Sequence, residues 1–275
     1  SHIYVALGMW DEVISSNIAS YNAADAKRLA EDLEPDTRNY HALEWLMYGC
    51  LQKGDRDTAR TLLENMLEYK DEKPSPRARG YALQMLGGYL ANTAEWEDPV
   101  ATTQIDVEDL NVVFYGLQGF IKGMHAYSTG DMATLSSVID SLQEKRITEG
   151  KLLMQRGTKM CSGLSWFTQL PTQSEINHTN IMEMELRALL AKANGAMEEA
   201  DEWFAKATEL EENTSFMFGP PVVVKPSFEM YAEFLYEQGS YDQALKYVNK
   251  ALEKTPGRRI QVLLKSEIEQ NLNAI

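Results

Sequence analysis

Basic residues are scarce in this chain. Its 275 residues include 26 Lys or Arg against 41 Asp or Glu, so the formal net charge is −15. Nucleic acids and anionic membrane surfaces are bound by clustered Lys and Arg, which neutralise phosphate groups. The composition therefore disfavours both kinds of partner. It predicts either a solvated acidic surface or a partner that is basic or apolar.

Cysteine and long apolar runs are also lacking. The two cysteines, Cys50 and Cys161, form no CxxC motif and no disulfide framework. No apolar run reaches the roughly 20 residues that cross a bilayer, and no signal peptide is present, so no membrane insertion is expected. Because the chain begins at Ser1, in what resembles the middle of a repeat, we expect a piece of a longer protein with any targeting segment upstream. The compartment stays open, with a slight preference for the cytoplasm.

Motifs of catalysis and metal binding are missing too. None of the four histidines is paired with another His, Cys or carboxylate at the spacing of a zinc site. His41 and Glu44 share a helical face, but carboxylate di-metal bundles need that motif twice and it occurs once. No GxSxG, P-loop or dinucleotide motif is present. The sequence predicts a protein that is not an enzyme, with no catalytic residues, no metal and no cofactor.

What the chain does contain is a recurring pattern around turn glycines. In EQGSYDQALKYVNKALEKTP, from Glu237 to Pro256, small and large apolar residues alternate at the spacing of a helical hairpin. Similar offsets surround Gly195 and Gly54, and weaker ones surround Gly130 and Gly8. Glycine ends a helix cheaply in the left-handed conformation. One hairpin cannot bury both of its faces, so neighbouring hairpins must stack.

This pattern predicts an all-α fold: a single α-α superhelix of antiparallel hairpins over 1–275. The expected hairpins cover about 1–35, 37–73, 76–109, 110–146, 173–213 and 224–256, and a capping helix covers 257–273. Ile260, Leu263, Leu264, Ile268 and Leu272 would cover the last hairpin. The stretch PVVVKP is bracketed by prolines and predicts an extended linker. In GLQGFIKG, three glycines near one helical face predict close helix packing.

These offsets resemble the tetratricopeptide repeat, a helix–turn–helix unit of about 34 residues. The hairpin that ends at Pro256 carries nearly every signature position, and the resemblance covers most of the chain with unequal strength. The opening SHIYVALGMWDEVISSN, together with FGPP…KP, is similar to a group of large bacterial tetratricopeptide proteins of unassigned role.

The resemblance implies a concave groove lined by the first helix of each hairpin. Some family members clamp a carboxylate terminus there with Lys, Arg and Asn, but the matching positions here hold Glu and apolar residues. A close like-charge pair costs roughly 1 kcal/mol or more, so a basic or amphipathic segment is the expected ligand. Alternatively, the apolar members pack on neighbouring helices and the carboxylates are solvated. The candidate groove residues are His41, Glu44, Tyr48, Phe120, Met124, Tyr127, Glu185, Leu189, Glu229, Glu233 and Tyr236.

Three functions fit this prediction. The first is a non-enzymatic protein–protein interaction scaffold that binds a peptide or partner segment in the acidic and apolar groove. The second is a regulatory or substrate-presenting domain of an enzyme whose catalytic part lies upstream of residue 1. The third is a structural module that self-associates through its N-terminal repeat. The functional part of each rests on the analogy of fold.

Overall fold

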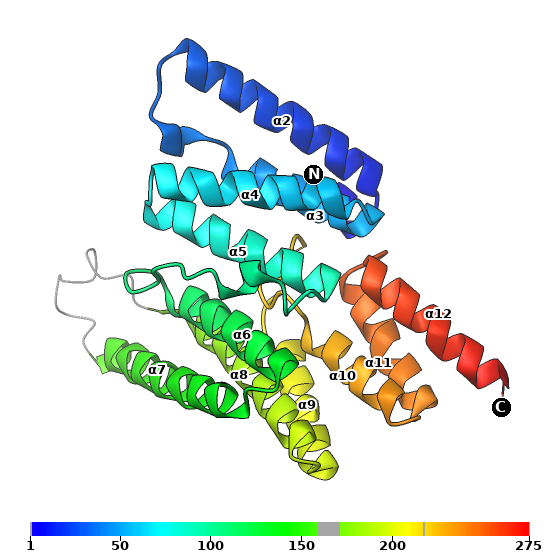
Figure 1. Cartoon of the computed structure of the whole chain (residues 1–275). Helices are drawn as coiled ribbons and strands as arrows, with labels where there is room; N and C mark the ends of the chain where they lie inside the picture. Colours follow the sequence, from blue (N-terminus) through cyan, green and yellow to red (C-terminus); the bar gives the residue numbers. More distant parts are fainter. Residues whose placement is uncertain (1, 159–170, 217, 275) are drawn as a thin grey trace. The chain divides into compact units, whose positions relative to one another are not determined.

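A computed structural model describes residues 2–158, 171–216 and 218–274 (Figure 1). All regular elements in these ranges are helices, and successive helices pack on their neighbours in chain order, as in a helical solenoid. The predicted all-α fold is therefore confirmed. The turn glycines Gly54, Gly130, Gly195 and Gly239 have φ between 73° and 79°, the left-handed region that the hairpin pattern predicts. Cys161 lies outside the described residues.

The chain forms two compact units. Unit 1 joins Ser1–Glu95 to Phe216–Ile275, and unit 2 is Trp96–Ser215. Unit 1 therefore contains both ends of the sequence. Within unit 1, α12 (Arg259–Ala274) contacts α3 (Tyr40–Lys53) as well as α11 (Tyr241–Lys254).

The N-terminal part of unit 1 is built around α3. Every residue of α3 from Ala42 to Gln52 is buried, because its sequence is apolar on nearly all sides and its neighbours surround it. Asn39 caps the start of α3, and Asp55 caps the helix that follows. The elements around α3 are α1 (His2–Ala6), α2 (Trp10–Ala30), η1 (Pro35–Thr37), α4 (Arg56–Glu72) and α5 (Pro76–Thr93).

The C-terminal part of unit 1 consists of residues 216–226, α10 (Ser227–Glu237), α11 and α12. The PVVVKP stretch is non-helical, as expected of a linker, but Val223, Val224 and Lys225 are buried. The predicted capping helix corresponds to α12, and its Ile268 is fully buried. Leu263 is 47% exposed, so its predicted place against the last hairpin is wrong. Ile260, Leu264 and Leu272 are half-buried.

Unit 2 is a pair of helical hairpins preceded by an irregular segment. The hairpin expected at 76–109 does not form as a pair of helices. Its first part is α5, which belongs to unit 1, and its remainder is irregular apart from a short 3-10 turn. Gly116 and Gly123 face side chains of α8, and Gly119 faces Leu142 of α7, so the predicted close helix packing is confirmed. The elements are η2 (Pro99–Thr102), α6 (Val112–Thr129), α7 (Met132–Thr158), α8 (Gln173–Ala193) and α9 (Met197–Glu212).

Replacing Gly123 with Ala is expected to lower the free energy of unfolding by about 1–3 kcal/mol, the usual cost of overpacking. A Cβ at this position would lie 2.6 Å from Leu186 Cδ1, and Leu186 is fully buried and has little room to move. The matched control is Gly150→Ala in α7, where a Cβ meets no atom within 4 Å and helix propensity favours Ala. Urea unfolding of both variants checks this, and equal effects at the two sites would contradict it.

Candidate functional site

Unit 1 contains a cavity of about 590 Å³, which we call the Glu44 cavity. Its walls come from α1, α3, α5 and residues 218–222, and they include His2, His41, Glu44, Trp45, Tyr81, Gln84 and Phe218. A volume of this size falls within the range of pockets that hold small ligands or anchoring side chains.

Local sequence explains how these side chains come together. His41, Glu44, Trp45 and Tyr48 are spaced i, i+3, i+4 and i+7 along α3, so they share one helical face. Across the cavity, residues 218–222 approach α3 closely at Gly219. A Cβ there would lie 2.8 Å from the Trp45 ring, so glycine permits this wall to form.

Aromatic rings make up much of the cavity wall. The His2 and His41 ring centroids lie 4.4 Å and 4.9 Å from the Trp45 ring, and 5.8 Å from each other. Burial, and the nearby His2, lower the pKa of His41 below its usual value, so this imidazole is neutral at pH 7. The wall therefore presents aromatic faces.

Glu44 is the buried carboxyl group of the cavity. Its exposed fraction is 8%, and it makes no hydrogen bond or ion pair with any residue in the described part of the chain. Burial raises the pKa of Glu44 to about 8. Burial also raises the pKa of the Tyr81 hydroxyl, and the nearby Glu44 raises it further. A buried carboxyl group without a partner is costly to the fold.

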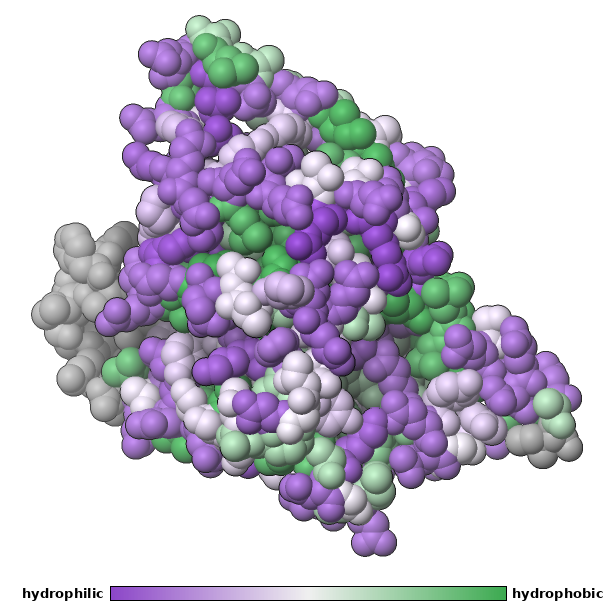
Figure 2. Space-filling model, in the orientation of Figure 1, coloured by the Kyte–Doolittle hydropathy of each residue, from purple (hydrophilic) through white to green (hydrophobic). Residues whose placement is uncertain are grey.

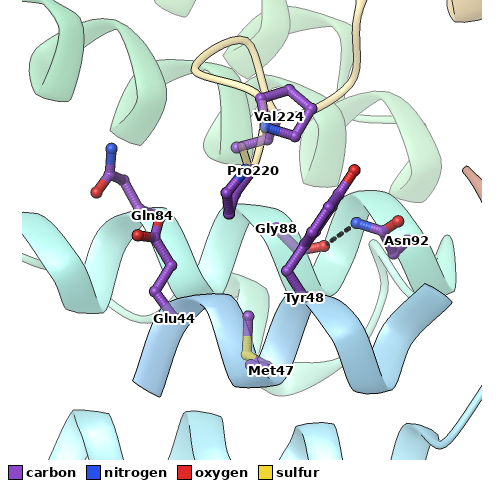
Figure 3. Close-up of a pocket in the computed structure, with 9 residues that line it drawn as sticks. Glu44, Met47, Tyr48, Gln84, Gly88, Asn92, Pro220 and Val224 are labelled. Carbon is purple, nitrogen blue, oxygen red and sulfur yellow. Dashed lines mark hydrogen bonds between the residues drawn. The ribbon is translucent and has the colours of Figure 1, made fainter. Parts of the chain in front are cut away.

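A second, much smaller cavity lies behind Glu44 (Figure 3). Its volume is about 10 Å³, close to the space that one water molecule needs. In Figure 3 Glu44 and Gln84 lie at one end of this cavity, and Tyr48 and Asn92 lie at the other. The Asn92 side chain donates a hydrogen bond of 2.7 Å to the Gly88 carbonyl.

A buried charge cluster ties the C-terminal part of unit 1 to α3. The fully buried Arg258 guanidinium donates to Glu229 at 2.9 Å, to the Tyr48 hydroxyl at 3.3 Å and to the Val224 carbonyl at 3.2 Å. Lys225 lies 3.5 Å from Glu229 and 2.7 Å from Glu233. Burial alone lowers the pKa of Lys225, but these carboxylates outweigh it and raise the pKa. The cluster therefore neutralises two residues that the sequence places in an acidic groove.

The structure separates the predicted groove residues. In unit 1, His41 and Glu44 line the Glu44 cavity and Tyr48 lines the smaller one, whereas Glu229 and Glu233 are paired with cations. Tyr236 accepts a hydrogen bond from Asn271. In unit 2, most candidates are buried in the packing of the helices: the alternative describes this for the apolar members, whereas it places Glu185 in solvent and the structure buries it. The buried candidates are Phe120, Met124, Glu185 and Leu189, with Tyr127 half-buried.

Sequence reasoning missed several residues of the cavity wall. Trp45 of α3 could have been found, because it lies four residues after His41 on the same helical face. Tyr81 and Gln84 lie in α5, within the least regular predicted hairpin. Phe218 and Gly219 belong to the FGPP stretch, whose prolines indicate a rigid turn but not what it contacts.

Comparison of the chain with known proteins identifies no relative. Searches of family models, curated proteins and solved structures find no match to the chain. Across the described ranges, no group of three or more His, Cys, Asp or Glu side chains is arranged to hold a metal ion. In those same ranges, no helix combines the length and apolar character needed to cross a membrane. On the face shown in Figure 2, hydrophilic side chains predominate.

Proposed function

We propose that the chain is a non-enzymatic interaction scaffold of the tetratricopeptide kind, and that unit 1 binds a basic or amphipathic segment of a partner protein in the Glu44 cavity. The observation that carries the proposal is Glu44 itself, a buried carboxyl group without a protein partner that lines an aromatic cavity.

The chemistry of the cavity suits a cation carried on an apolar stem. Glu44 is protonated at neutral pH in the free chain and supplies the counter-charge when a bound cation displaces that proton, and Trp45 and Tyr81 supply faces on which a cation and its aliphatic stem can pack. A carboxylate ligand would find no Lys or Arg among the side chains that line the cavity. The net charge of −15 further favours the approach of a basic segment.

The tetratricopeptide assignment draws support from the short turns within hairpins, such as the one between α3 and α4 and the one between α10 and α11. It also accounts for the stacking of helices in chain order within the described residues. Such scaffolds present partner-binding surfaces between stacked helices, and α3 and α5, which both line the cavity, are in contact.

Selection from a library of random peptides tests the proposal. We expect the enriched peptides to carry Lys or Arg, and to lose at least about tenfold in affinity for Glu44→Gln, since a charge-assisted hydrogen bond contributes about 1.5–3 kcal/mol. Glu68→Gln on the exposed side of α4 is the matched control and should bind normally. Enrichment of peptides without basic residues, or equal binding to Glu44→Gln, would refute the proposal.

A further inference from the structure

Two side chains with hydrogen-bond acceptors line the Glu44 cavity. Glu44 and Gln84 line both cavities, and Figure 3 shows them at the same end of the smaller one. Neither side chain has a hydrogen-bond partner among the described residues, although Glu44 is more than nine-tenths buried. Buried acceptors in folded proteins are nearly always satisfied, so Glu44 indicates a ligand that carries hydrogen-bond donors, and the half-buried Gln84 offers a further acceptor in the same cavity.

We propose that the cavity is specific for arginine, and that the guanidinium of an Arg side chain in the partner segment binds Glu44 and Gln84 between the aromatic rings. This inference rests on the proposed function and names the side chain that the site recognises.

Arginine fits these acceptors better than lysine does. A guanidinium is planar and offers five N–H donors, so it can bind a carboxylate through two parallel hydrogen bonds and still donate to the Gln84 oxygen. It is more weakly hydrated than an ammonium group, which lowers the cost of entering a buried site, and it stacks on aromatic faces. Trp45, His41 and Tyr81 supply such faces around Glu44.

Other cations leave the site unsatisfied. A quaternary ammonium group favours aromatic surroundings but has no hydrogen to donate, so both Glu44 oxygens would stay without a bond. A lysine ammonium has three donors around one point, so it cannot lie flat against an indole while it bridges two acceptors.

The charged and titratable groups around Glu44 leave its carboxylate available to the guanidinium. Those that line the two cavities with it are His2 from α1, His41 and Tyr48 from α3, and Tyr81 from α5. Residues 218–222 contribute none. Arg77 lies over the Tyr81 ring at 5.8 Å, which shows that this ring already accepts one guanidinium.

The test uses blocked glycine peptides with a central Arg, Lys or citrulline, with binding followed by calorimetry. Citrulline keeps the shape of arginine but lacks its charge. We expect the Lys and citrulline peptides to bind at least about tenfold more weakly than the Arg peptide, given the strength of charge-assisted hydrogen bonds. In Glu44→Gln the advantage of Arg over citrulline should disappear, and in Glu68→Gln it should persist. Circular dichroism verifies that both variants are folded.

The outcomes separate this inference from the function beneath it. Lys binding as tightly as Arg, with both dependent on Glu44, would overturn the arginine assignment and leave the scaffold proposal standing. Methylguanidinium alone binding as tightly as the Arg peptide would overturn both, because the site would then take a free small molecule. The absence of any Glu44-dependent binding by the basic peptides, together with failure of the library selection, would also overturn both.

Discussion

Replacing Arg258 with Met should lower the free energy of unfolding by about 3–5 kcal/mol, the usual cost of breaking a buried ion pair by removing one partner. Arg258 has no exposed surface, and its guanidinium bonds Glu229, Tyr48 and the Val224 carbonyl. Without it, the Glu229 carboxylate stays buried with Lys225 at 3.5 Å and Gln261 at 3.2 Å as its remaining partners. The same change removes the hydrogen bond from Arg258 to Tyr48 of α3, and leaves the one from the Arg259 backbone N–H to Gln52 at 2.9 Å, so it weakens the contact between the two ends of unit 1.

Two further variants identify the cause of that loss. Arg258→Met combined with Glu229→Gln leaves Lys225 paired with Glu233 and no excess negative charge, and should recover most of the lost stability because a neutral replacement of a buried pair is often tolerated. Arg258→Lys keeps the charge but lacks the planar fork that reaches three acceptors, so it should fall between the two. Urea unfolding at neutral pH measures all three. A double variant as unstable as Arg258→Met would show that packing, rather than the stranded carboxylate, dominates.

The hairpins could be predicted because their signals are local. A glycine at each turn, small residues at the crossing and an apolar face are all visible within one stretch of chain, and Gly54 and Gly239 end their hairpin's first helix as that pattern requires. The return of the C-terminal segment to α3 could not be predicted. Arg258 and Tyr48 are 210 positions apart. In a repeat array each repeat is expected to contact only its neighbours, so the repeat pattern does not predict a contact between these two residues.

The residues of the candidate site could likewise be predicted only where they lie close together in the sequence. His41 and Glu44 were predicted together because they share a face of one helix, whereas Tyr81 and Phe218 reach the cavity from elements that no local pattern connects to α3. Buried charge is a second difficulty. Glu229 has the spacing of a groove residue in the sequence, but in the structure it is 1% exposed and paired with Arg258. A hydrophobicity pattern cannot distinguish a paired buried carboxylate from a solvated one.

Glu44 should make the stability of unit 1 fall as the pH rises. The pKa of Glu44 is about 8 in the folded chain, against 4.5 for an ordinary glutamate, so between these values the folded state holds a proton that the unfolded state has lost. Stability decreases with pH wherever the folded state binds more protons. The stabilising effect of the neutral carboxyl group is complete below about pH 4.5 and is lost by the time the pH has risen past about 8.

The size of this effect is large for one side chain. The difference between about 8 and 4.5 corresponds to roughly 5 kcal/mol at 1.36 kcal/mol per unit. Glu44→Gln keeps the shape of the neutral acid and cannot ionise. We therefore expect the variant and the native chain to have similar stability near about pH 5, and the variant to be more stable by several kcal/mol above about pH 8. Urea unfolding across this range measures the difference, with Glu68→Gln as the control that should follow the native chain.

Taking the difference between the native chain and Glu44→Gln isolates this group. Burial lowers the pKa values of His41 and His178. Their contribution to the stability of the fold therefore has the opposite pH dependence: it is lost as the pH falls below about 6.5, the ordinary pKa of histidine. Those contributions are shared by both proteins and cancel. Parallel curves would mean that water or a neighbouring dipole already stabilises the Glu44 carboxylate. If the curves diverge, the Arg peptide should stabilise the native chain more above pH 8 than near pH 6, because the guanidinium replaces the proton that Glu44 loses.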